Sequence, residues 1–220
     1  MKLKTLILTM RSDDTIKANA AKLRGFFATE FNNYILLHQH KGDGFVYHYP
    51  LVQYKMIEDI PFILSINEGV EVLKDIYNKY HSVKLGRNSY EVMEKVIKIK
   101  DEEFGINDNS AGYSFLTPWL ALNEKNYERY IRIRDWAGKK QFLAKVLVGN
   151  IISMSKSLGY TVPAPIKAGL GRVREVKTSL KGTPMLGFLG TFSVNFNIPD
   201  YWGIGKSVSR GFGTVRKIRL

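Results

Sequence analysis

Three of the four histidines in this sequence, His38, His40 and His48, are crowded into residues 38–48. Imidazole titrates closest to neutral pH of all side chains, so it can take up or release a proton during a reaction. Only Gln39 separates His38 from His40, and in an extended segment both rings would project to one face. We therefore identify His38 and His40 as candidate catalytic residues. His48 lies between two tyrosines, and we expect it to pack or to lie at the surface.

Two other roles stay open for the histidine pair. A histidine in such a segment can be purely structural. A His-x-His pair can also bind a metal ion, and Asp43 is close in sequence, but no third ligand follows at a recognisable spacing. We therefore predict no metal site and no cofactor.

A glycine-rich stretch, Tyr201–Val215, has the composition of a phosphate-binding loop. Glycine permits positive φ and close backbone approach, and successive free N–H groups form an anion site. Lysine and arginine add positive charge, and serine adds hydroxyl donors. The candidate RNA-binding residues of this stretch are Gly203, Gly205, Lys206, Ser207, Ser209, Arg210, Gly211 and Gly213. The alternative is a plain turn between two strands.

The spacing of these glycines does not fit a free nucleotide. The Walker A motif requires a glycine five residues before Gly205, where Asp200 stands. The dinucleotide-binding pattern requires a third glycine where Val208 stands. A polynucleotide backbone therefore fits this stretch better than a mononucleotide.

Charge is distributed unevenly along the sequence. Residues 1–110 contain 15 Lys+Arg and 15 Asp+Glu, whereas residues 111–220 contain 18 and 5, so the second half carries the whole net charge of +13. Such an imbalance is typical of a protein that binds a polyanion. Arg172 and Arg174 share a face of a predicted strand at a spacing suited to neighbouring phosphates, although an ordinary solvated face is the alternative. A membrane surface is a weaker alternative, because no basic amphipathic segment of the membrane-binding kind stands out.

The end of the sequence resembles a known family. The pattern Gly-x-Gly, five residues, Gly-Phe-Gly at 203–213, with the preceding run Met185–Pro199, resembles the glycine-rich loop and leading strand of the CRISPR repeat-processing endoribonucleases of the repeat-associated mysterious protein (RAMP) superfamily. Over the first hundred residues the resemblance rests on element order and the histidines. It implies two tandem ferredoxin-like (RRM-like) domains, and a histidine after the first helix, where His38 and His40 stand.

The resemblance also implies a reaction. CRISPR repeat RNA would be cut without metal when a ribose 2′-OH attacks the adjacent phosphorus, leaving a 2′,3′-cyclic phosphate and a 5′-OH. Such a reaction needs a base, an acid and a cation that stabilises the charge on phosphorus. The rival interpretation is a non-catalytic RNA-binding subunit of a CRISPR ribonucleoprotein, and a third is a metal-dependent nuclease. The oligomeric state and an effector complex as partner stay open.

The elements that would position these residues follow an α+β order. In the first half we expect strands and helices in the order β-α-β-β-α-β, which is ferredoxin-like. Their expected ranges are Leu3–Met10, Ile16–Phe31, Phe45–Ile57, Ile60–Ile66, Glu68–Tyr80 and Glu91–Phe104. Asp13 or Asp14 would cap the first helix, and Gly105–Gly112 would be a linker. The predicted domains are residues 1–106 and 107–220.

In the second half we expect a distorted repeat of this unit. The expected elements are a strand at Tyr113–Leu116, helices at Glu124–Asp135 and Gln141–Leu158, a hairpin of Ile166–Thr178 with Met185–Asn197, and a last strand at Thr214–Leu220. No apolar run approaches the roughly 18 residues of a membrane span. The absence of cysteine fits a cytoplasmic protein without disulfides.

Overall fold

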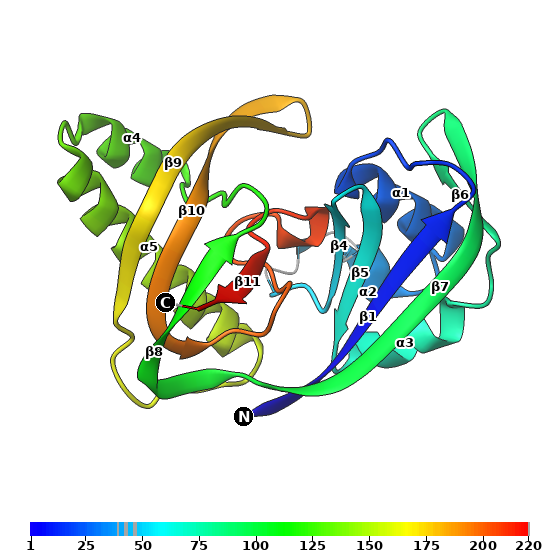
Figure 1. The fold of residues 1–220 in the computed structure, drawn as a ribbon, viewed down its shortest axis with the longest axis horizontal. Coiled ribbons are helices and arrows are strands. Elements are labelled where there is room, and N and C mark those ends of the chain that lie inside the picture. The colour runs from blue at the N-terminus through cyan, green and yellow to red at the C-terminus, as the bar shows by residue number, and fades with distance from the viewer. Residues whose placement is uncertain (39, 42–43, 46–47, 220) are drawn as a thin grey trace. The chain divides into compact units, whose positions relative to one another are not determined.

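The computed structural model describes residues 1–38, 40–41, 44–45 and 48–219 (Figure 1). The chain divides into two compact units. The N-terminal unit comprises Lys2–Glu102 together with Ser209–Gly211, and the C-terminal unit comprises Met1, Glu103–Val208 and Phe212–Leu220. Each unit is built on its own β-sheet.

The N-terminal sheet has the strand order β4-β5-β1-β7-β6. Its strands are β1 (Lys2–Ser12), β4 (Val52–Ile57), β5 (Ile60–Ile66), β6 (Ser82–Leu85) and β7 (Asn88–Glu103). The helices of this unit are α1 (Ala20–Glu30), the four-residue α2 (Ile35–His38) and α3 (Glu68–Ile76). A separate two-stranded ladder joins β2 (His40–Lys41) to β3 (Gly44–Phe45).

Alternation along the strands builds the core of the N-terminal unit. In β1, Leu6, Leu8 and Met10 are buried on one face, as a period of two residues requires. They belong to the same cluster as Phe27 of α1 and Leu73 of α3. The sheet therefore buries one face against α1 and α3, and α2 joins this core through one buried leucine.

The C-terminal sheet has the order β11-β8-β10-β9. Its elements are β8 (Gly105–Phe115), α4 (Glu124–Arg132), α5 (Trp136–Ser157), β9 (Ala168–Leu180), β10 (Thr183–Asn197) and β11 (Val215–Ile218). In chain order this is the strand arrangement of the N-terminal sheet again, so both units are ferredoxin-like, as predicted. Where the N-terminal unit has α3 between its third and fourth strands, the segment between β10 and β11 contains the glycine-rich stretch and the short helix η1 (Val208–Arg210).

The predicted hairpin of the C-terminal unit is confirmed and is long. Strands β9 and β10 pair antiparallel, from Thr183 opposite Leu180 at the turn to Val194 opposite Ala168 at the far end. Figure 1 shows them as two strongly curved neighbours. Positive φ at Lys181 (52°) and Gly182 (82°) makes the connection a type I′ turn, whose twist matches that of the strands. A register shift lies between Gly190 and Phe192.

Several sequence-based boundaries were wrong for local reasons. The first helix begins at Ala20 because Asn19, not Asp13 or Asp14, caps it through a bond from the Lys22 N–H. The segment Gly105–Gly112, predicted as a linker, forms most of β8 because its backbone pairs with β10. By contrast, the predicted cap Asn123 of the next helix is confirmed. No helix in the described part of the chain is long and apolar enough to cross a membrane.

Candidate functional site

His38 is the last residue of α2, and the fold holds both its ring and its backbone. Its Nε2 lies 2.9 Å from the carbonyl oxygen of Asn32, which can only accept a hydrogen bond, so neutral His38 carries its proton on Nε2 and its lone pair on Nδ1. The Arg24 Nη2 donates to the carbonyl of His38 at 2.5 Å. His38 is half-buried. The hydrogen bond to Asn32 therefore fixes the orientation and the tautomer of the neutral ring.

Arg24 and Arg210 bring two positive charges to this part of the N-terminal unit. Burial, and then the charge of Arg210, lower the pKa of Arg24. The Nε of Arg24 is buried and has no hydrogen-bond partner within the described part of the chain. Arg210 belongs to the predicted RNA-binding set. Arg24 was not predicted, because a single arginine in a helix is ordinarily expected to be exposed to solvent. An anion beside both guanidinium groups would relieve their mutual repulsion.

The second catalytic candidate, His40, begins β2 and pairs with Phe45 in the short ladder, but its side chain lies outside the described atoms. The premise that His38 and His40 lie on one extended segment is wrong, because His38 ends a helix before the strand begins. His48 is exposed. Asp43, the neighbour considered for metal binding, lies outside the described residues. Across the residues that are described, no group of three His, Asp or Glu side chains could hold a metal ion.

Tyr34, a conceivable helper in catalysis, is part of a surface cluster instead. Its hydroxyl donates to the Asp75 carboxylate, and the Lys79 ammonium lies 3.1 Å from Asp75 Oδ1 and 3.3 Å from the Tyr34 oxygen. The hydrogen bond from Tyr34 and then that from Lys79 lower the pKa of Asp75. Tyr34 is therefore held by the surface of α3 and its C-terminal turn.

The glycine-rich stretch (Tyr201–Val215, hereafter the glycine-rich loop) is held by its own backbone. In the C-terminal unit, the N–H of Lys206 donates to Leu120 O at 3.1 Å and that of Gly213 to Pro118 O at 2.9 Å. The N–H of Ile204 donates to Gly213 O at 2.9 Å. These donors are consumed within the protein, so the expectation of a cradle of successive free N–H groups is wrong at these positions.

Several predicted RNA-binding residues of the loop are buried, namely Gly203, Ser209, Gly211 and Gly213. Gly205, Ser207 and Arg210 are half-buried, and Lys206 is exposed. Positive φ at Gly205 (90°), Ser207 (59°) and Gly213 (63°) lets the chain fold back tightly. Most loop glycines therefore serve packing, and the side chains of Lys206, Ser207 and Arg210 are the accessible donors.

Gly211 shows why one of these positions is a glycine. It lies in the part of the loop that belongs to the N-terminal unit. A Cβ there would lie 2.8 Å from Ala20 Cβ and 3.1 Å from the carbonyl oxygen of Tyr54, and φ is +86°. Close approach to α1 and β4 therefore requires a residue without a side chain.

Arg172 and Arg174 lie elsewhere, on the exposed surface of β9. Both contribute to the wall of a cavity of about 410 Å³, together with Trp136, Lys140 and two residues of β10. Lys206 instead borders a larger cavity of about 1060 Å³ between α4 and the hairpin, which also contains Lys177 and Lys181. Within the C-terminal unit, the predicted RNA-binding side chains thus belong to separate surfaces.

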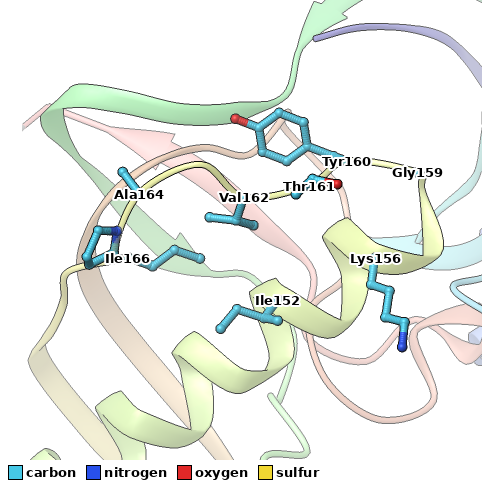
Figure 2. A pocket seen from close by; sticks show the side chains of 9 residues that line it. Ile152, Lys156, Gly159, Tyr160, Thr161, Val162, Ala164 and Ile166 are labelled. Atoms are coloured by element: carbon cyan, nitrogen blue, oxygen red, sulfur yellow. The ribbon is translucent and has the colours of Figure 1, made fainter.

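A further cavity, of about 480 Å³, lies where α5 leads into β9. Figure 2 shows Ile152, Val162 and Ile166 around it, with Lys156 extending from α5 away from the loop. Tyr160 beside it accepts the N–H of Ile106 at 3.0 Å. With one cation and an apolar wall, this cavity is poorly suited to a polyanion.

A buried lysine lies on β4 of the N-terminal unit. Lys55 is fully buried, and its Nζ donates to Gln53 Oε1 at 3.0 Å. Burial lowers the pKa of Lys55 to about 7. The apolar residues Val52, Tyr54 and Met56 alternate with Gln53 and Lys55, so the pattern predicts that Lys55 is exposed, whereas the structure buries every residue from Val52 to Lys55.

Comparison with known proteins places both halves of the chain in one family. The Cas6b N-terminal domain matches residues 1–103, and the Cas6b C-terminal domain matches residues 105–218. Among curated proteins, an uncharacterised protein of Methanocaldococcus jannaschii is 51% identical over 129 residues, which are 59% of this chain and 87% of that protein.

Solved structures agree with this. The match to a crystal structure of Cas6b spans 99% of this chain and 100% of the Cas6b chain, with 38% sequence identity and a TM-score of 0.90. A crystal structure of the CRISPR RNA processing endoribonuclease Cas6b has 36% identity, a TM-score of 0.78 and the same coverage. The type IV Cas6 crRNA endonuclease Csf5, 12% identical with a TM-score of 0.58, shares the fold.

Proposed function

This chain belongs to the Cas6b family, whose members process CRISPR RNA, and we propose that it cuts CRISPR repeat RNA without a metal ion, leaving a 2′,3′-cyclic phosphate and a 5′-OH. The match of both halves to Cas6b, with 38% identity to a solved structure over nearly the whole chain, is the observation that carries this proposal. Residues 1–106 would form the catalytic domain and residues 107–220 the basic RNA-binding domain.

The site geometry supports an acid–base mechanism. Neutral His38 holds a lone pair on Nδ1 while Asn32 fixes its other nitrogen, which is the arrangement of a general base. His40, two residues on, would supply the second proton transfer. Arg24 binds the backbone carbonyl of His38, and the charge of Arg210 lowers the pKa of Arg24. These two arginines would stabilise the charge that develops on phosphorus.

In this mechanism the protein supplies no nucleophile. The base takes the proton of the 2′-OH, the 2′ oxygen bonds to phosphorus, and the bond from phosphorus to the 5′ oxygen breaks. The acid then gives a proton to that leaving oxygen, so charge and protons balance. RNA would be held in place by Lys206, Ser207 and Arg210 of the loop and by Arg172 and Arg174 on β9.

Incubating the protein with repeat RNA in EDTA tests the proposal. We expect cutting at the same rate with and without chelator, and products that carry a cyclic phosphate. A 2′-deoxy substitution at the cut site should abolish cutting while RNA still binds. Cutting that EDTA stops and added metal restores would show a metal-dependent nuclease instead. Binding without any cutting would favour the rival function, a non-catalytic RNA-binding subunit.

A further inference from the structure

The cavity beside Trp136 is built where three elements of the C-terminal unit meet. Trp136 and Lys140 come from the first turns of α5, Arg172 and Arg174 from β9, and Gly190 from β10. At Gly190, φ is +140° and a Cβ would lie 1.8 Å from the Arg172 carbonyl oxygen. The register shift in this part of the hairpin is a β-bulge, a device that re-aims side chains near binding sites.

The residues around this cavity carry only positive charge. Lys140, Arg172 and Arg174 line it, and no carboxylate does. Throughout the described part of the chain, none of these three cations forms an ion pair. The larger cavity between α4 and the hairpin differs, because Glu124 and Glu175 offset its lysines. The Trp136 cavity is therefore the stronger anion site of the two.

Trp136 adds an accessible aromatic surface to these cations. Of the three tryptophans, Trp119 and Trp202 are fully buried, whereas 40% of Trp136 is exposed. The Lys139 ammonium lies over the Trp136 ring, 5.7 Å from its centroid, and is itself bonded to Glu175 at 3.2 Å. This cation–π contact helps to hold the large apolar ring of Trp136 in place at the surface.

An exposed aromatic ring among unpaired cations is the combination that binds single-stranded nucleic acid. Aromatic rings stack on bases of any sequence, and cations hold the adjacent phosphates. The cavity of about 410 Å³ lies within the usual range of small-ligand pockets. We propose that Trp136 stacks on one unpaired base of the RNA substrate while Lys140, Arg172 and Arg174 bind its flanking phosphates. This inference rests on the proposed function for the identity of the ligand.

Tryptophan fluorescence tests this site directly, because the other two tryptophans are buried. Titration of the wild-type protein with a single-stranded eight-nucleotide oligoadenylate should quench its fluorescence. Trp136→Phe, which keeps an aromatic ring, should bind with near wild-type affinity but lose the quenching. Trp136→Ala should bind about 5- to 150-fold more weakly, the range for loss of one base–aromatic stack.

Tyr127→Ala is the matched control. Tyr127 is 46% exposed on α4 and borders the larger cavity, so its loss should leave oligoadenylate affinity unchanged. Equal losses in Tyr127→Ala and Trp136→Ala would overturn the assignment. So would quenching that persists in Trp136→Phe, equal quenching by an acidic peptide such as hexaglutamate, or failure of the wild-type protein to bind or be quenched by the oligoadenylate.

The stacking site and the catalytic proposal can be refuted separately. If the wild-type protein is quenched by oligoadenylate through Trp136 but does not cut repeat RNA, the stacking site stands and the catalytic proposal fails. If repeat RNA is cut in EDTA and oligoadenylate binding leaves the fluorescence unchanged, the reverse holds.

Discussion

Helix α2 and the glycine-rich loop are anchored by different means. In α2, side chains do most of the holding: Arg24 binds the His38 carbonyl, Tyr54 Oη donates to the Leu37 carbonyl at 3.4 Å, and the His38 ring meets Asn32. In the loop, backbone groups bind one another and the segment that follows β8. A side-chain change in α2 should therefore affect chemistry, whereas a backbone change in the loop should affect folding.

The largest expected effect is on the α2 side. Replacing His38 or His40 with alanine should slow single-turnover cleavage about 10²- to 10⁴-fold, the usual contribution of general acid–base catalysis, while RNA binding is retained. His48→Ala, which alters an exposed residue, is the control and should lose much less. Full activity in the His38→Ala/His40→Ala double variant would refute the assignment of catalysis to this segment.

Gly213→Ala probes the loop. A Cβ there would lie 1.9 Å from the Ile204 carbonyl oxygen, and φ is +63°, so the backbone must shift. We expect a loss of about 3 kcal/mol or more in the free energy of unfolding, measured by urea denaturation. Gly159→Ala has a similar φ of +75° but open space around it, and it should lose about 1 kcal/mol. Equal losses would mean that the loop backbone is not constrained by packing.

Lys55 lies in β4, which Gly211 of the loop approaches, and it should make stability depend on pH. Its folded-state pKa of about 7 is below the roughly 10.4 of an unfolded lysine, so the unfolded chain binds more protons between these values. Stability should therefore rise with pH across this window, by at most about 1.4 kcal/mol per pH unit from this group. Urea unfolding of wild type and Lys55→Met at pH 7.5 and pH 9 measures the difference. An identical pH dependence in both proteins would show that Lys55 stays charged when folded.

The smallest expected effects concern the surface cations. RNA affinity should fall steeply as salt rises, through release of counterions from phosphates. Arg172→Ala or Arg174→Ala should each flatten the slope of log affinity against log salt by about 0.7 for single-stranded RNA. Arg129→Ala, which removes a cation of α4 that borders none of the three cavities described above, is the control. Affinity that does not change with salt would argue against phosphate binding.

Sequence reasoning found the chain order of most helices and strands because this order depends on periodic patterns over whole elements, and the family resemblance supplied the expectation of two ferredoxin-like domains. It missed α2 because a helix of four residues, Ile35–His38, has no period to read, so the two histidines were placed on one strand. It also read the loop glycines as a phosphate cradle. The N–H of Gly213 and that of Lys206 bind carbonyls more than 80 residues away in sequence, a pairing that no local pattern encodes.

Arg24 and Lys55 escaped for a related reason. In the sequence, both residues occupy positions that look like ordinary exposed positions of a helix and of a strand. Only the tertiary structure around them buries them. Trp136 was likewise not predicted, because stacking potential depends on exposure, and a tryptophan in sequence gives no sign of whether it is buried like Trp119 or accessible. Residue types were therefore readable from the sequence, but their surroundings were not.

The pairing of β11 with β8 has a consequence for how the protein is made. Val215 pairs with Phe115, and the N–H of Val215 closes the loop onto the Trp202 carbonyl at 2.9 Å. A ribosome makes α2 and its histidine long before it reaches Val215. A nascent chain that has reached the end of β7 therefore lacks β11, the strand that closes the glycine-rich loop. If the proposed function holds, the loop side chains that would bind RNA take up their positions late in synthesis, after α2 and His38 have been made.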